Sequence, residues 1–209
     1  TPLAGAPAHL LVLADGRVAA TLRDRNEVQL LEPFADPTAP LEPRCTVSVA
    51  VEPIGLAATP DDRAILVTSG FGHTLSALDA TALSPLFTVD LAREPRAVLV
   101  SDDGKKAFVA HVVGAKMSAV DLASSAHPVH EIDLRVGRAV PRSPNARQVE
   151  SQFRVEREEQ PRPGCQGFAL AKASASAVAG RIFAPMVTVD PGEGGLVEVR
   201  TSGYGGSSS

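Results

Sequence analysis

The sequence predicts an all-β protein built from repeated four-stranded antiparallel sheets. Glycine and proline, with 17 residues each among 209, interrupt the chain often, so long helices are not expected. The apolar runs are short and are bounded by turn-forming residues, as in antiparallel strands. A sequence pattern also returns after 42 positions (95 − 53), with Pro53 and Pro95 among its landmarks.

The charge and hydropathy of the chain exclude two classes of interaction. The 20 Lys and Arg residues face 24 Asp and Glu residues, which gives a net charge of −4. Nucleic-acid binding usually shows as a basic patch, so we expect no nucleic-acid partner. No apolar run approaches the roughly 18 residues that a membrane-spanning helix needs, so we expect no transmembrane segment.

The two clearest repeat units align without a gap over most of their length. Residues 52–67 align with 94–109, and Leu78-Asp79 aligns with Val120-Asp121. One inserted residue then aligns residues 89–91 with 132–134. Shared landmarks at a constant spacing indicate a true internal repeat.

Each unit contains four apolar runs in the same order. Acidic turns separate the first run from the second, because Asp hydrogen-bonds to its own backbone and Gly accepts a positive φ. These turns contain Asp61, Asp62, Asp102 and Asp103, which we interpret as turn formers and not as calcium ligands. The predicted strands are 54–58, 64–68, 75–78 and 86–91, then 97–100, 107–113, 117–120 and 129–134.

Weaker copies of the pattern lie on both sides. The predicted strands are 9–13, 18–22, 28–31 and 45–51 upstream, and 166–171, 182–189 and 196–199 downstream. The predicted units are therefore about 8–52, 53–94, 95–134 and 165–202, with a long polar loop at 135–164 and a flexible Gly/Ser tail or linker at 203–209.

Four-stranded units of about 42 residues have the size of β-propeller blades. One such sheet cannot bury both of its faces, so blades stack around a shared axis. This chain supplies about four blades, whereas a ring of roughly seven is expected for this repeat length. Either four blades close the ring, or a second polypeptide or a missing C-terminal part completes it. We favour completion, because open blade faces would expose apolar patches; an identical copy would also complete the ring by symmetry.

The repeats resemble the YVTN-type (YncE-like) β-propellers of bacterial periplasmic and cell-surface proteins. The resemblance rests on Pro-Ile-Gly-Leu-Ala-Ala-Thr-Pro-Asp-Asp-Arg at 53–63, on the strands 66–69 and 108–111, and on the Asp-terminated runs 77–79 and 119–122. It covers 50–134 well, although Leu66 stands where the family has Tyr and Ser69 or His111 where it has Asn. The resemblance implies a periplasmic, secreted or cell-surface location.

Three further segments are similar to large secreted proteins in which a propeller precedes a di-haem cytochrome c peroxidase-like (MauG-like) domain. These segments are 94–98, 110–114 and 165–169. The resemblance implies a haem domain after residue 209. The chain has no Cys-x-x-Cys-His motif, so it encodes no cofactor of its own, and haem c or a metal is expected only in a partner domain.

Arg96, His73 and His111 are the candidate residues for a ligand or partner site on the propeller rim. Arg96 follows Pro95 at the start of an inner strand and is expected to project toward the channel mouth; the alternative is an Arg paired with a neighbouring carboxylate. His73 and His111 lie near the ends of second strands in consecutive units, where imidazoles could contact a metal, a haem edge or an anion. The alternative is two independent surface histidines, so no metal site is predicted firmly.

The remaining candidates are weaker. His127 and His130 form a loop pair that is best explained as solvated histidines. The charged run 154–159 is either a solvated face or a docking loop for a partner, and Gly192–Gly195 is expected to form a hairpin turn. Cys45 and Cys165 fit either two separate buried thiols or a disulfide, which would suit an oxidising compartment.

Two function hypotheses follow. The first is a non-catalytic propeller that serves as the scaffold or recognition part of a larger secreted assembly, with a partner that supplies further blades and a haem redox centre. The second is an enzyme: a propeller hydrolase or lactonase with a channel metal, or a redox enzyme whose site is shared between chains. Fold alone does not decide between them.

Overall fold

The computed structural model describes residues 1–36, 38–134, 164–174 and 177–188. They form three four-stranded antiparallel sheets followed by two short strand pairs, which confirms the predicted all-β fold. The sheets are β1 (Pro7–Val12), β2 (Val18–Leu22), β3 (Glu27–Glu32) and β4 (Glu42–Ser48); β5 (Pro53–Ala58), β6 (Ala64–Ser69), β7 (Thr74–Asp79) and β8 (Pro85–Asp90); and β9 (Pro95–Val100), β10 (Lys106–His111), β11 (Lys116–Asp121) and β12 (Val129–Asp133). Within these described ranges, no helix has the length and hydropathy needed to cross a membrane.

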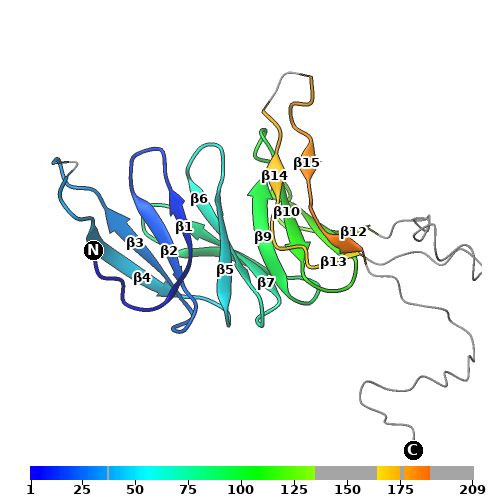
Figure 1. The fold of residues 1–209 in the computed structure, drawn as a ribbon. Helices are drawn as coiled ribbons and strands as arrows, with labels where there is room; N and C mark the ends of the chain where they lie inside the picture. The colour runs from blue at the N-terminus through cyan, green and yellow to red at the C-terminus, as the bar shows by residue number, and fades with distance from the viewer. Residues whose placement is uncertain (37, 135–163, 175–176, 189–209) are drawn as a thin grey trace, which may run out of the picture.

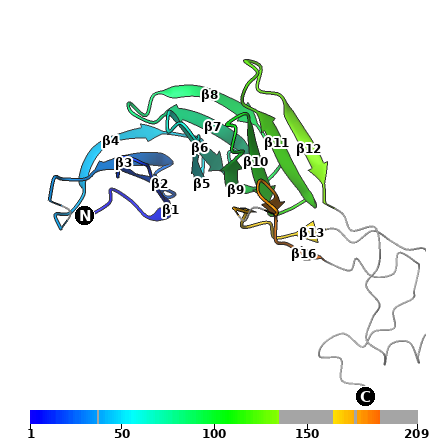
Figure 2. The ribbon, with the colours of Figure 1, turned by 90° about the horizontal axis from the view of Figure 1, so that it is seen from above.

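The three sheets stand side by side in an arc (Figures 1 and 2). In each sheet the strand order follows the chain. Figure 2 shows β1, β5 and β9 on the concave side of the arc and β4, β8 and β12 on the convex side. The first strand of every sheet therefore faces a common axis, as in a propeller. We call the three sheets blades 1, 2 and 3.

Apolar side chains fill both spaces between the blades. Successive residues of a strand point to opposite faces of the sheet, so β6 places Ile65 and Val67 toward blade 1 and Leu66 toward blade 3. Blades 1 and 2 bury Leu13, Ala19, Val28, Leu30, Leu56, Ile65, Val67, Leu78, Ala80 and Leu83 between them. Blades 2 and 3 bury Leu66, Leu75, Ala77, Val98, Val100, Ala107, Val109 and Val120.

The strands predicted for the second and third units agree with the structure to within two residues at each end. In blade 1 the predicted and observed bounds differ most for the last strand, which is predicted at 45–51 and lies at 42–48. This strand is the outer edge of its sheet, where a residue without an N–H, such as Pro43, is tolerated. Residues 49–52 instead connect blade 1 to blade 2.

Residues 164–174 and 177–188 contain the first two strands of a fourth unit. In this segment β13 (Gly164–Cys165) pairs with β16 (Val187–Thr188), and β14 (Ala171–Lys172) pairs with β15 (Ile182–Phe183). The two pairs are parts of one antiparallel hairpin separated by a register shift, and the first two strands of each complete blade carry a register shift at the same place.

The predicted strands 166–171 and 182–189 of the fourth unit are therefore shorter than expected. Gln166 has a φ of 59° and interrupts the first of them. Pro185 lacks the N–H that a continuous second strand needs. The predicted strand 196–199, nearly all of the loop 135–164 and the tail 203–209 lie outside the described residues.

The acidic residues between the first and second strands of a blade form turns, as predicted. Asp61 accepts hydrogen bonds from the Thr59 hydroxyl and from a backbone N–H of its own turn, and Asp103 makes the equivalent bonds in blade 3. These bonds stabilise the carboxylate form and lower the pKa of both carboxyls. Asp102 instead pairs with Lys172 of the fourth unit, with 2.5 Å between Oδ1 and Nζ.

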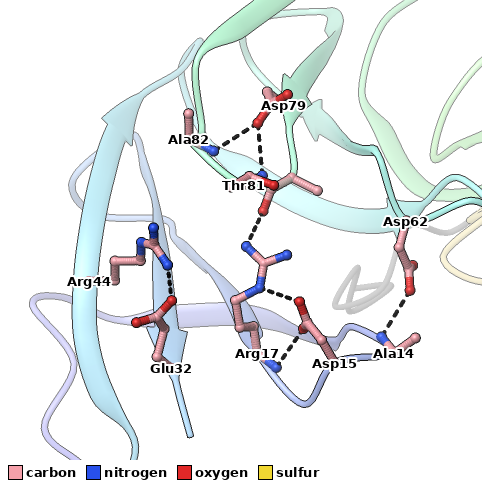
Figure 3. A network of polar contacts seen from close by, with 10 residues as sticks. Ala14, Asp15, Arg17, Glu32, Arg44, Asp62, Asp79, Thr81 and Ala82 are labelled. Atoms are coloured by element: carbon pink, nitrogen blue, oxygen red, sulfur yellow. Dashed lines mark hydrogen bonds and ion pairs between the residues drawn. The ribbon is translucent and has the colours of Figure 1, made fainter.

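Polar contacts join blades 1 and 2 at this end of the sheets (Figure 3). Arg17 donates a hydrogen bond to the Ala80 carbonyl at 2.6 Å and is oriented by Asp15. Asp62 accepts a hydrogen bond from the Ala14 N–H at 3.0 Å. The two blades are therefore held together at these turns as well as by their apolar faces.

Threonine hydroxyls join the inner strands of neighbouring blades. The Thr68 hydroxyl accepts from the Gly55 N–H of its own blade at 2.9 Å and donates to the Arg96 carbonyl of blade 3. Thr21 occupies the same position in blade 1 and donates to the Ile54 carbonyl of blade 2. Each hydroxyl therefore satisfies two backbone groups that belong to different blades.

We expect Thr68→Val to lower the free energy of unfolding by about 2 kcal/mol, because the Gly55 N–H and the Arg96 carbonyl would lose the partner that satisfies them. Urea denaturation followed by circular dichroism measures the change. Thr46→Val, on the exposed side of β4, is the control and should change stability little. Equal effects of the two substitutions would contradict a role for the hydroxyl in joining blades.

Candidate functional site

The residue that precedes the inner strand has a left-handed backbone conformation in blades 2 and 3. The φ angles are 64° for Glu52 and 51° for Glu94. In both places a side chain from the preceding blade accepts the backbone N–H: Asn26 Oδ1 from Glu52 at 3.0 Å, and His73 Nδ1 from Glu94 at 3.3 Å. The turn between the second and third strands of one blade thus positions the start of the next.

The start of the fourth unit is positioned differently. Ala115 lies at the position of Asn26 and His73, with a φ of 49°, and its side chain has no acceptor. The N–H of Gln166 donates to the Val112 carbonyl at 2.7 Å instead. Side-chain acceptors are therefore used at the first two junctions and a backbone acceptor at the third.

Four charged residues meet at the end of the blades that carries the turns between second and third strands. We call them the rim cluster: Arg23, Glu52, Glu94 and Arg96. Arg23 donates a hydrogen bond to Glu52 Oε1. Arg96 Nη1 lies 3.4 Å from Glu52 Oε2, and Arg96 Nη2 lies 3.5 Å from Glu94 Oε2. Because Arg23 follows β2 and Arg96 is the second residue of β9, the cluster links all three blades.

Glu52 is the centre of the rim cluster. Its side chain is only 4% exposed, against 16% for Arg96 and 56% for Arg23. A Cβ on Gly70 would come closer than 3.0 Å to Glu52 Oε2, so glycine leaves the space that this carboxylate occupies. Among the described residues, Glu52 Oε2 and Arg96 Nε have no hydrogen-bond partner, so charge attraction is the main interaction that holds Arg96.

Exposed apolar side chains surround the rim cluster. Val51, Phe71 and Val113 are 52%, 60% and 37% exposed, and all three lie in the connections and turns at this end. We call the rim cluster together with these three residues the rim surface. Exposed apolar groups beside arginine are typical of surfaces that bind another protein. The two arginines and the two glutamates of the rim cluster cancel in net charge. The cluster therefore favours recognition by shape and by individual charge pairs, and not by net charge.

The structure gives the three residues predicted for the rim site different contacts. Arg96 pairs with Glu52 and Glu94, as in the alternative interpretation of an Arg beside a carboxylate. His73 positions Glu94 through its ring nitrogen. His111 is 3% exposed and is engaged within blade 3.

Both ring nitrogens of His111 have partners. Nδ1 lies 3.0 Å from the Arg93 carbonyl, and Nε2 lies 2.8 Å from the Ser118 hydroxyl. Because a carbonyl only accepts, Nδ1 carries the proton and Nε2 accepts from Ser118. His111 in this state stabilises the link to blade 3 and has no nitrogen left for a metal.

The weaker candidates His127, His130 and Cys45 differ in their surroundings. His127 stacks on Phe87 with ring centroids 3.6 Å apart, and His130 is exposed on β12. The thiol of Cys45 is free and half-buried on β4. The charged run 154–159 and the glycines of 192–195 lie outside the described residues.

A metal-dependent site finds no support in the part of the chain that the structure describes. No group of three or more His, Cys, Asp or Glu side chains there is arranged to hold a metal ion. The hypothesis of a hydrolase with a channel metal therefore has no candidate ligand set in these residues.

Sequence reasoning missed the most buried member of the rim cluster, Glu52. A signal for it was present, because Glu-Pro occurs at 52–53 and again at 94–95 in the aligned units. The partners Arg23 and Arg96 are 73 positions apart (96 − 23), and no local pattern connects them.

Stability should fall as the pH drops below about 6.5. Burial lowers the pKa of His9 and of His111 from 6.5. His9 Nδ1 accepts the Leu56 N–H across the first blade junction, which requires an unprotonated nitrogen. The unfolded chain then binds protons that the folded chain does not, so the free energy of unfolding decreases as pH falls through 6.5 toward the lower folded pKa.

Urea denaturation between about pH 7.5 and pH 5.5 measures this dependence. His9→Asn keeps a side-chain acceptor and removes the titrating group, so its pH dependence should be weaker. His130→Asn, at an exposed position, should leave the dependence unchanged. A wild-type stability that is constant over this range would contradict the assignment.

No family model matches the sequence, and no curated protein matches it. Several solved structures are similar in fold. A putative 6-phosphogluconolactonase from Bacteroides uniformis matches 87% of this chain and 54% of its own, with a TM-score of 0.54 and 13% identity. A protein from Lactobacillus plantarum matches over 66% and 43%, with a TM-score of 0.54 and 14% identity.

The hydrazine synthase of Kuenenia stuttgartiensis matches over 56% of this chain and 32% of its own, with a TM-score of 0.51 and 21% identity. These neighbours are β-propeller-like proteins, and the chain spans between about a third and about half of their length. At such identities the likeness shows the fold alone. The chain is an arc of a β-propeller, with three complete blades in its described residues and the beginning of a fourth.

Proposed function

We propose that this chain is the scaffold and recognition part of a larger assembly, in which further blades complete the propeller ring. One observation carries the proposal. Leu56 on β5 and Val98 on β9 are 3% and 8% exposed because the preceding blade covers them, whereas the equivalent Leu10 on β1 is 54% exposed. The first face of the arc therefore lacks the neighbour that the other blades have.

The length of the chain supports the same proposal. The chain covers 54% or less of each of the three propeller-like neighbours described above. A closed ring buries the faces of all its blades, whereas an arc leaves two faces in water. The missing blades belong to a second polypeptide or to a longer form of the same protein.

The rim surface is the proposed recognition element of the assembly. It combines Arg23, which is more than half exposed, with the exposed side chains of Val51 and Phe71. Glu52 and Arg96 form a buried base beneath it, so the surface is held rigid across three blades. A rigid surface with apolar and arginine contacts suits a protein partner.

We further propose an extracytoplasmic location and a c-type haem centre in the partner. Both rest on the resemblance to YVTN-type propellers and to proteins that join a propeller to a di-haem domain. In that arrangement the partner supplies all of the haem ligands, and this chain supplies the rim surface. A Soret band in the purified assembly, together with its absence from the isolated chain, would support the haem partner.

The mass of the native assembly tests the main proposal. Tagged protein purified from its producing cells should have a native mass well above the 21.7 kDa of one chain. Where a second polypeptide supplies the missing blades, Leu10→Asp combined with Val12→Asp should reduce the mass to that of one chain. Denaturing electrophoresis then shows whether a second polypeptide is present. A native mass of one chain for the wild type would contradict the proposal.

A further inference from the structure

We infer that the rim surface binds a segment of a partner protein in which an apolar side chain stands between acidic side chains. This inference rests on the proposed function, in which the rim surface is the recognition element, and it names the chemistry of the partner. The turns and connections of blades 1 to 3 at this end are all among the described residues. The inference therefore does not depend on which polypeptide completes the ring.

The turn between β6 and β7 forms the centre of this surface. The N–H of Gly70 donates to the Glu52 carbonyl at 2.8 Å, in the connection that precedes blade 2. The N–H of Gly72 donates to the Val51 carbonyl at 2.9 Å in the same connection. Phe71 lies between these two bonds, so it is held next to Val51, and the two side chains are 60% and 52% exposed. They form an apolar centre.

The last residue of the same turn is bonded to the connection between blades 2 and 3. His73 accepts the Leu91 N–H at its carbonyl, at 2.7 Å, and the Glu94 N–H at its ring. Arg93 is exposed and lies in the chain between Leu91 and Glu94. One side of the turn that carries Phe71 is therefore flanked by an exposed arginine.

Arg23 flanks the turn on the side of blade 1. Its guanidinium donates to Oε1 of Glu52, the residue that directly follows Val51. The side chain is 56% exposed, and its guanidinium has no second acceptor among the described residues. Arg93 has no ion pair within the same part of the chain. The apolar centre thus lies between two arginines that have donors free for a partner.

The carboxylates of the rim cluster are less accessible than its outer arginine. Glu52 is 4% exposed and Glu94 is 25% exposed, against 56% for Arg23. A partner therefore meets arginine charges first, although the cluster is neutral in sum. Carboxylates bind guanidinium groups through charge-assisted hydrogen bonds, so acidic side chains are the complementary groups.

A uniformly anionic partner fits this surface poorly. Asp24 follows Arg23 and is exposed, and one of its oxygens holds the Ala6 N–H at 2.7 Å. A nucleic acid or an anionic membrane would bring negative charge to Asp24 as well as to the arginines. A protein segment can place single carboxylates at the arginines and an apolar side chain against Phe71. These observations favour a protein segment over the other two classes.

Panning of a display library of short random peptides on the purified chain tests this inference. We expect the selected peptides to share an apolar residue flanked by Asp or Glu. Phe71→Ser should weaken their binding about tenfold, and Arg93→Gln about threefold, measured by fluorescence anisotropy. Added salt should weaken binding further. Arg63→Gln is the matched control, because Arg63 is exposed at the opposite end of blade 2.

A charge exchange separates pairing with Arg93 from a loss of folding. Each acidic residue of a selected peptide is replaced in turn by Lys. One of these peptides should lose binding to the wild-type chain and recover it on Arg93→Glu. Because Arg93 has no ion pair in the described part of the chain, this substitution should leave the blades intact, which circular dichroism checks.

Three outcomes would overturn the acidic partner. The first is a library in which no sequence is enriched, and the second is a set of purely apolar peptides that bind Arg93→Gln as well as the wild type. The third is binding to vesicles of phosphatidylserine and phosphatidylcholine that the selected peptides do not displace. In all three cases a native mass above that of one chain would leave the proposed assembly standing. A native mass of one chain would contradict that assembly whichever peptides are selected.

Discussion

Gly55→Ala should lower the free energy of unfolding by about 3 kcal/mol, because the new methyl group has no space between blades 2 and 3. A Cβ on Gly55 would come closer than 3.0 Å both to the Arg96 carbonyl oxygen and to Thr68 Oγ1. The first of these is backbone of the next blade, which cannot rotate away. The substitution therefore either separates the two inner strands or breaks the hydroxyl bridge between them.

The repeat itself provides the control for this substitution. Ala97 occupies the position of Gly55 one unit later and already carries a Cβ, and Ala110 stands there in the place of Thr68. Ala97→Gly should therefore have a small effect, of about 1 kcal/mol or less, from backbone entropy. Urea denaturation of both variants measures the difference. Equal losses at the two positions would show that blade contact at Gly55 is not tight.

The fold could be predicted because its information is local and is repeated. The turns at Asp61 and Asp103 and the alternation of apolar residues recur at one spacing, so one unit supports the interpretation of the next. Differences arose where tertiary contacts decide the ends of strands. The last strand of blade 1 begins earlier than predicted because an outer edge accepts Pro43.

The site was less predictable because its members come from three blades. The sequence identified Arg96, and also the option that it pairs with a carboxylate. It could not identify Glu52 as that carboxylate, since the ion pair spans 44 positions (96 − 52) and depends on the packing of two inner strands. The histidines show a related problem. The repeat offset places His111 opposite Ser69 and not opposite His73. It could not show that both ring nitrogens of His111 have partners, or that His73 holds the Glu94 N–H.

Glu52→Gln should lower the free energy of unfolding by about 3 kcal/mol, because a buried ion pair that loses one partner leaves the other charge uncompensated. The glutamine keeps the shape of the side chain, so Arg23 can still donate to its oxygen. Arg96 is only 16% exposed and would keep only Glu94, 3.5 Å away. Arg96→Gln in the same chain should recover part of the loss, since it removes the unpaired cation.

A surface pair shows why burial is the cause. Lys116 and Glu131 are 2.6 Å apart, closer than Arg96 and Glu52, but Glu131 is 53% exposed. Glu131→Gln should therefore cost about 0.5 kcal/mol or less, because water solvates the charge that remains. If separation alone decided the energy, the order of the two losses would be reversed. A Glu52→Gln loss no larger than that of Glu131→Gln would mean that the rim cluster does not hold the three blades together, and the rim surface would lose its rigid base.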